Sequence, residues 1–236
     1  MNQGACERTN VIRVPSKNAT FAIMIRIKSF AFNPYQENTY LLYDDTGATV
    51  VIDPGMYGPN EEQQVNEFIR SEGLKPELLL NTHCHIDHVL GNRHIYEEYG
   101  LLPQFHEGEL PLLVEVQNYA PQMGIRYEVS PIAEKFLPSS GTVTFGQREL
   151  ELIFAPGHSP AHLCFYNRNA GFLIGGDVLF RGSIGRTDLP GGNHQQLLDS
   201  IAQKLYMLPD DTVVYPGHGP ETTIGHEKKT NPFVRG

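Results

Sequence analysis

The sequence has few cysteines and no long apolar run. Its 236 residues include only three cysteines, Cys6, Cys84 and Cys164. An odd and sparse set of this kind does not build the disulfide framework of a small secreted protein. It fits a reducing compartment, and we therefore expect a cytoplasmic protein.

Positive charge is also scarce. The chain has 18 Lys and Arg against 27 Asp and Glu, which gives a formal net charge of −9 at pH 7. Binding to nucleic-acid phosphates needs a concentrated Lys and Arg surface, and the sequence has no basic stripe. No apolar run approaches the ~20 residues that a membrane-spanning helix needs. We expect neither a nucleic-acid partner nor a membrane partner.

The N-terminal 23 residues are polar, mixed and without clear periodicity. From Met24 to Phe30 apolar and polar residues alternate, as they do in a half-buried strand. The sequence predicts a disordered extension over residues 1–23 and one folded domain over residues 24–236. With 40% hydrophobic residues, a chain of this length can bury one sizeable core.

One short segment concentrates side chains that bind metals. Residues 82–88 read THCHIDH and follow the apolar run Leu78–Leu80, which is typical of a buried strand. Side chains alternate along a strand end, so His83 and His85 can point to one side. Asp87 and His88, past the bend, can turn toward a second position. The segment therefore allows two metal positions.

Three later loops offer one further ligand each. His158, Asp177 and His218 each stand in a glycine-rich loop directly after an apolar, strand-like run. In α/β proteins the loops at strand ends converge into a site. We expect these three loops to meet the histidine-rich segment.

Together these residues resemble the metallo-β-lactamase superfamily. The stretch Gly176–Asp188 is similar to its glyoxalase II-like branch, the hydroxyacylglutathione hydrolases. This resemblance implies an α/β fold, the αββα sandwich, in which two β-sheets pack face to face beneath outer helices. Strand-like stretches and helices in both halves of the chain agree with that architecture.

The resemblance also implies a metal centre. By the family's pattern one metal is held by His83, His85 and His158, the other by Asp87, His88 and His218, and Asp177 bridges the two. Imidazoles and carboxylates suit zinc, iron or manganese, and we expect two divalent cations, zinc before the others. Two cations ~3.5–4 Å apart can share a water, lower its pKa toward ~7 and so supply a hydroxide that attacks a carbonyl. Asp87 and Asp177 are the residues we expect to act in catalysis.

Three functions stay open. The resemblance implies a dinuclear hydrolase that acts on a small-molecule thioester. A mononuclear-iron persulfide dioxygenase is the first alternative, because Gly185–Asp188 and the short C-terminus also resemble that class. A non-catalytic metal-binding scaffold is the second. The chain ends 18 residues after His218. This segment is too short for the helical domain with which glyoxalase II contacts glutathione, so the sequence does not identify the thiol of the substrate. It does not give the oligomeric state either.

Four further expectations concern residues around the ligands. The family implies that Asp53 supports a loop or a ligand histidine through hydrogen bonds. Cys84, between two ligands, should pack away from the metals. His162 adjoins a predicted strand, so we do not place it in the site. Arg186 and Asp188 are expected to form a buried ion pair.

Overall fold

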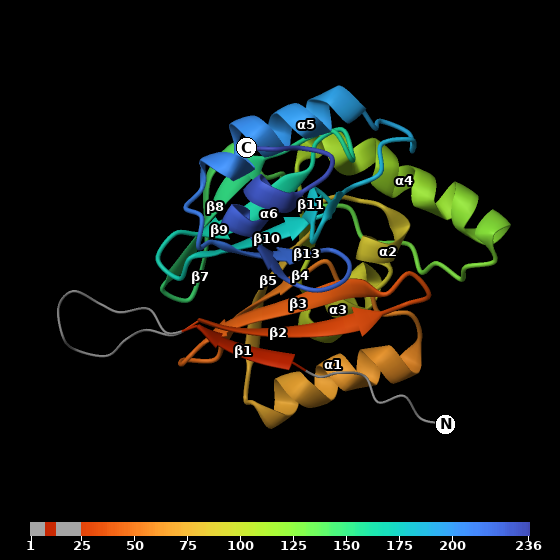
Figure 1. Ribbon diagram of the computed structural model, residues 1–236. Coiled ribbons are helices and arrows are strands. Elements are labelled where there is room, and N and C mark those ends of the chain that lie inside the picture. Colours follow the sequence, from red (N-terminus) through yellow and green to blue (C-terminus); the bar gives the residue numbers. More distant parts are fainter. Residues whose placement is uncertain (1–7, 13–24) are drawn as a thin grey trace, which may run out of the picture.

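The computed structural model describes residues 8–12 and 25–236, which form two six-stranded sheets that lie face to face between layers of helices (Figure 1). The first sheet has the order β1-β2-β3-β4-β5-β6 and is built from β1 Arg8–Ile12, β2 Ile25–Phe32, β3 Glu37–Asp44, β4 Ala48–Ile52, β5 Lys75–Leu80 and β6 Pro103–Gln104. The second has the order β14-β13-β10-β9-β8-β7 and is built from β7 Ser140–Phe145, β8 Arg148–Phe154, β9 Leu163–Asn167, β10 Phe172–Gly176, β13 Val213–Pro216 and β14 Thr222–Thr223. A small hairpin pairs β11 Leu179–Phe180 with β12 Ser183–Ile184.

The helices cover the outer faces of both sheets. They are α1 Pro59–Ser71, α2 Ile86–Val89, α3 Asn92–Tyr99, α4 Leu110–Tyr119, α5 His194–Gln203 and α6 Ile224–Thr230, with the 3₁₀ turns η1 Glu107–Glu109, η2 Ala120–Met123 and η3 Leu205–Met207. In Figure 1, α1 lies beneath the first sheet and α5 above the second. The predicted αββα sandwich is confirmed.

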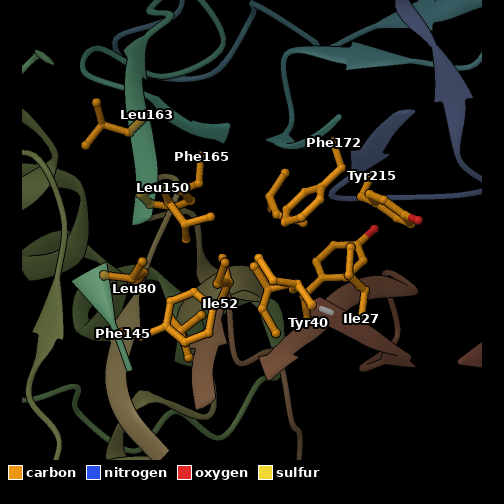
Figure 2. Packing of buried hydrophobic residues seen from close by; sticks show 14 of the residues in the cluster. Ile27, Tyr40, Ile52, Leu80, Phe145, Leu150, Leu163, Phe165, Phe172 and Tyr215 are labelled. Carbon is orange, nitrogen blue, oxygen red and sulfur yellow. The ribbon is translucent and has the colours of Figure 1, made fainter. Parts of the chain in front are cut away.

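The main core lies between the two sheets. Figure 2 shows its buried side chains, with Ile27, Tyr40, Ile52 and Leu80 from the first sheet facing Leu150, Phe172 and Tyr215 from the second. The rings of Tyr40 and Tyr215 meet edge to face at a centroid distance of 6.0 Å. The Tyr40 hydroxyl also donates to the carbonyl of Pro216 at 2.7 Å, so this aromatic side chain ties the sheets together while its polar group stays paired.

Parallel pairing brings four strand ends to one edge of the sandwich. In the first sheet β4 runs parallel to β5, and in the second β10 runs parallel to β13. The carboxyl ends of parallel strands lie side by side, which is where α/β proteins gather their functional loops. Asp53 follows β4, the histidine-rich segment follows β5, Asp177 follows β10 and the His218 loop follows β13. The two sheets are also joined here, because the Asn38 N–H donates to the Gly217 carbonyl at 2.7 Å.

Within the expected extension over residues 1–23, Arg8–Ile12 forms β1 and pairs antiparallel with β2. The rest of that expectation, and the boundary at Met24, lie outside the described residues. No helix in the described parts of the chain is long and apolar enough to cross a membrane.

Candidate metal centre

Three histidines from two loops meet beyond the end of β5. His83 and His85 leave this strand, and His158 comes from the loop after β8. The Nε2 of His158 lies 2.9 Å from the Nδ1 of His85 and 3.2 Å from the Nε2 of His83. All three side chains are buried. Their ring nitrogens could hold one metal ion, and we call these residues the first group.

A second group forms from Asp87, His88 and His218. The Asp87 carboxylate lies 3.2 Å from the Nε2 of His218 and 3.8 Å from the Nε2 of His88. Their ligand atoms also lie close enough together to hold one ion. Asp87 and His88 belong to the short helix α2, which turns the chain after His85, so the predicted change of direction occurs at that point.

Asp177 faces both groups. One of its carboxylate oxygens lies 3.5 Å from the Nε2 of His158 and 3.6 Å from the Nε2 of His218, and the other lies 3.5 Å from the Nε2 of His88. The structure therefore brings together all seven residues that the sequence proposed as ligands.

Two glycines allow this close approach. A Cβ at Gly217 would lie 2.1 Å from an Asp177 carboxylate oxygen, and one at Gly185 would lie 1.9 Å from the Asp177 carbonyl. Both distances are shorter than any real side-chain contact, so only glycine lets these loops close around Asp177.

Burial sets the protonation of the first group. It lowers the pKa of His85 to about 3 and that of His158 to about 4. It also places the pKa of His83 well below its usual value. These three imidazoles are therefore neutral at pH 7 and keep a free lone pair, which is the form that binds a metal.

Opposite charges govern the second group. Burial raises the pKa of Asp87, but His88 and His218 outweigh it and hold that pKa below its usual range. For His88, burial lowers the pKa, and the carboxylates of Asp87 and Asp177 outweigh it and raise the pKa well above the usual value. The second group is thus an ionic cluster, whereas the first is a cluster of neutral rings.

The hydrogen bonds of four histidines aim one nitrogen of each ring into the cluster. Each donates through Nδ1 to an acceptor outside it: His83 to the Thr82 hydroxyl at 3.0 Å, His88 to Asp53 at 3.1 Å, His158 to the Arg186 carbonyl at 2.8 Å and His218 to the Tyr35 carbonyl at 3.1 Å. The Nε2 of each ring faces the other ligands. In the neutral rings of His83 and His158 it is an acceptor, and in His88, whose pKa is raised, it can bind a metal only after it loses its proton. This arrangement of outer partners is characteristic of metal-ligating histidines.

Three buried polar atoms of the ligand residues have no hydrogen-bond partner. One is the Nε2 of His85, whose Nδ1 faces His158; the other two, the Nε2 of His88 and one carboxylate oxygen of Asp177, lie 3.5 Å apart. A buried polar atom without a partner is costly and needs an explanation. Cations bound between these nitrogen and oxygen donors would satisfy the latter two atoms, so the residues fit divalent metals.

Asp53 supports the centre from behind, as expected. Its carboxylate accepts hydrogen bonds from the Thr82 N–H at 2.7 Å and the Thr82 hydroxyl at 2.6 Å, and it also contacts His88. Since the Thr82 hydroxyl in turn accepts from His83, Asp53 orients one ring of each group. Cys84 packs into an apolar cluster with Ile86 and Val89, as predicted.

His162 is a residue that the sequence reasoning left out. Its ring stacks on His83 with the centroids 5.0 Å apart, and its Nε2 accepts the Asp177 N–H at 3.1 Å. The predicted strand does follow His162, but β9 pairs antiparallel with β10, so the start of β9 lies beside the end of β10, where Asp177 is.

The Arg186–Asp188 pair is the second correction. The guanidinium donates two hydrogen bonds to the carboxylate, at 2.7 and 2.8 Å, but the two side chains are 61% and 68% exposed. The predicted pair therefore exists and is not buried. The Arg186 main chain contacts the centre instead, through its carbonyl and His158.

Sequence comparison finds relatives along most of the chain. A family model described as the metallo-beta-lactamase superfamily matches residues 32–218. A Bacillus subtilis protein described as the probable metallo-hydrolase YqgX is 38% identical over 205 residues, which cover 86% of this chain and 94% of the relative. The hydroxyacylglutathione hydrolase GloC of Haemophilus influenzae is 33% identical over 217 residues, which cover 89% of this chain and 98% of the relative.

Solved structures agree in fold. The B3 metallo-beta-lactamase BLEG-1 has a TM-score of 0.82 and 34% identity, and the match covers 89% of this chain and all of that one. The protein TTHA1623, solved in a di-iron-bound form, has a TM-score of 0.78 and 36% identity, with 87% of this chain and 99% of that chain covered.

Proposed function

The chain belongs to the metallo-beta-lactamase superfamily, and on that premise we propose that it is a dinuclear metal-dependent hydrolase that cleaves a small-molecule thioester. The observation that carries this proposal is the pair of complete ligand groups on either side of Asp177. A single-metal site would not need the second group.

In this proposal the first group would hold a metal at a first position, the second group would hold one at a second position, and Asp177 would serve as a ligand to both. The metals are divalent, zinc before iron or manganese. When bound, two such cations would lower the pKa of a shared water toward ~7 and polarise the carbonyl under attack. Asp87 and Asp177 are then the carboxylates closest to the reaction.

The residues around the centre fit a thioester. The rim includes Phe180, whose ring lies 6.3 Å from that of His218, and Tyr35, whose carbonyl fixes His218. Burial raises the pKa of Tyr119 to about 12, with Asp87 as a further cause, so this hydroxyl remains protonated at pH 7. A thiol with a pKa of ~8.5 leaves readily as a thiolate, so the site needs no separate general acid.

The substrate class rests on the relative named hydroxyacylglutathione hydrolase. We propose an acylated thiol and leave its identity to experiment. Cys84 and Cys164 are free and buried, which agrees with the proposal that the protein works in the cytoplasm.

One experiment tests the function. The metal content of the purified chain is measured, and the same sample is assayed for hydrolysis of S-lactoylglutathione and, in parallel, of a β-lactam. We expect two metals per chain and thioester turnover well above any β-lactam turnover. A chain that carries two metals and hydrolyses no thioester would refute the proposal.

A mononuclear-iron persulfide dioxygenase is the second candidate. It is favoured by the resemblance of Gly185–Asp188 to that class. One iron per chain, together with oxygen uptake that depends on a persulfide, would replace the hydrolase. If neither turnover is found, the non-catalytic scaffold remains.

A further inference from the structure

Glu109 is a fully buried carboxylate that the proposed reaction does not use. It ends the 3₁₀ turn η1 just before α4. One of its oxygens accepts the Cys84 N–H at 3.0 Å. The other accepts the Ser159 hydroxyl at 2.7 Å and the Ala161 N–H at 2.7 Å.

These donors lie on both loops of the first group. Cys84 stands between His83 and His85, and Ser159 directly follows His158. A single carboxylate therefore joins the two segments whose three imidazoles converge. We propose that Glu109 is the positioning residue of the first metal position: it fixes the spacing of the two loops and supplies negative charge beside a group that has none of its own.

The charge of the centre supports this assignment. Two divalent cations carry four positive charges, whereas the ligands proposed above include only two carboxylates, Asp87 and Asp177. Asp53 adds an anion that contacts His88 in the second group. Glu109 is its counterpart at the first group, where the imidazoles are neutral.

The surroundings of Glu109 do not explain a buried charge in another way. Burial raises its pKa, and the influences that oppose the rise are hydrogen bonds from Ser159, Cys84 and Ala161 rather than a cationic side chain. A buried carboxylate without a nearby cation is unfavourable. A metal bound by the adjacent histidines would provide that cation.

The test uses Glu109→Gln in the full chain. Whichever way the new amide is oriented, its NH₂ group faces a backbone N–H, that of Cys84 or that of Ala161, so one link is lost together with the charge. We expect the affinity of the first position for Zn²⁺ to fall about 10–100-fold, as for other partners that orient metal ligands. The affinity of the second position should stay near that of the unmodified chain.

Glu227→Gln is the matched control. Glu227 is also a fully buried carboxylate, and it accepts hydrogen bonds from the Gly182 N–H, the Thr222 hydroxyl and the Asn231 amide. These donors are not neighbours of the first group in sequence. Both variants should lower the Tm of the metal-free chain, but only Glu109→Gln should weaken Zn²⁺ binding at the first position.

Two readouts separate the positions. The chelator-stripped chain is titrated with Zn²⁺ against a coloured competing chelator, and a sample with one equivalent of Co²⁺ is examined by NMR for the shifted imidazole N–H signals. In Glu109→Gln those signals should come from His88 and His218.

The outcomes are distinct. If Glu109→Gln binds Zn²⁺ at both positions with the affinities of the unmodified chain, the inference is overturned. It is also overturned if the affinity falls equally at both positions. If Glu109→Gln does not fold, Ser159→Ala decides, because it removes one donor of three. A loss of about tenfold at the first position, the lower end of what a hydrogen bond to a charged group contributes, supports the inference, and an unchanged affinity refutes it. The inference rests on the proposed metal centre, whose failure would be visible separately as an unmodified chain that does not bind two metals.

Discussion

The two ligand groups differ in charge and in exposure. The first group consists of three neutral imidazoles that are between 0% and 9% exposed. The second includes a carboxylate, and the side chains of Asp87 and His218 are 14% and 26% exposed. A metal at the first position would be held by geometry that the fold imposes. A metal at the second would be held more by charge, on the side that a substrate can reach.

The largest effect on turnover is expected from a change at Asp177, which belongs to neither ligand group alone. Because its carboxylate faces both groups, Asp177→Ala removes a ligand from both positions at once. Thioester turnover should fall by more than the ~100-fold that loss of a residue that only orients a metal ligand can cost. The measurement is kcat together with metal content.

The same variant separates function from folding. Burial raises the pKa of Asp177, and the charges of His88 and His218 oppose the rise. Because these influences oppose one another, the metal-free Tm of Asp177→Ala should stay close to that of the unmodified chain. Near-normal turnover in this variant would exclude the proposed site.

The next largest effect tests the second group alone. His218→Ala, or Asp87→Asn, should empty the second position while His83, His85 and His158 still hold the first metal. Disturbing the support of one ligand typically costs about 10–100-fold in activity. Hydrolysis should fall by more than this, because a whole cation is lost.

The number of metal ions bound per chain is measured alongside turnover in both variants. The expected stoichiometry in both variants is one metal per chain with little turnover. If both keep full thioester turnover with one metal per chain, the two-metal mechanism is wrong, and the mononuclear alternative takes its place.

His162→Phe should have an intermediate effect. Phenylalanine keeps a ring against His83 but loses the nitrogen that accepts the Asp177 N–H. Asp177 would then be held less firmly, and we expect about a tenfold loss of turnover with both metals retained.

The control for that variant is His94→Phe. His94 belongs to α3 and contacts Asn66 and Glu62 of α1, and the change should leave turnover unaltered. Equal losses in the two variants would mean that His162 acts only through general stability.

The convergence of the ligand loops could be predicted from sequence because it follows from strand ends. His83, Asp177 and His218 each come soon after an apolar strand, and parallel pairing aligns β4 with β5 and β10 with β13. The sandwich is implied by the family resemblance of these ligand residues, and the strand-like stretches and helices in both halves of the chain agree with it.

His162 and Glu109 could not be predicted in the same way. His162 reaches Asp177 only because β9 returns antiparallel to β10, and the sequence alone does not state that pairing. Glu109 accepts two backbone N–H groups besides the Ser159 hydroxyl, and since every residue except proline carries a backbone N–H, the residue types do not reveal the link. The exposure of Arg186 and Asp188 depends on how the loop after β12 lies on the surface.

The smallest effect is expected at Arg186, although its main chain contacts the first group. The contact is the hydrogen bond from His158 to the Arg186 carbonyl, and the exposed side chain pairs only with Asp188. Arg186→Ala should therefore change the Zn²⁺ affinity of the first position by less than about twofold, since an exposed ion pair contributes little. The pKa of Asp188, which the Arg186 side chain holds at about 2, should return toward its ordinary value of ~3.9. Competition titration and NMR titration measure the two effects. A tenfold loss of affinity would show that the side chain holds the His158 loop, and that the first position depends on surface charge as the second does.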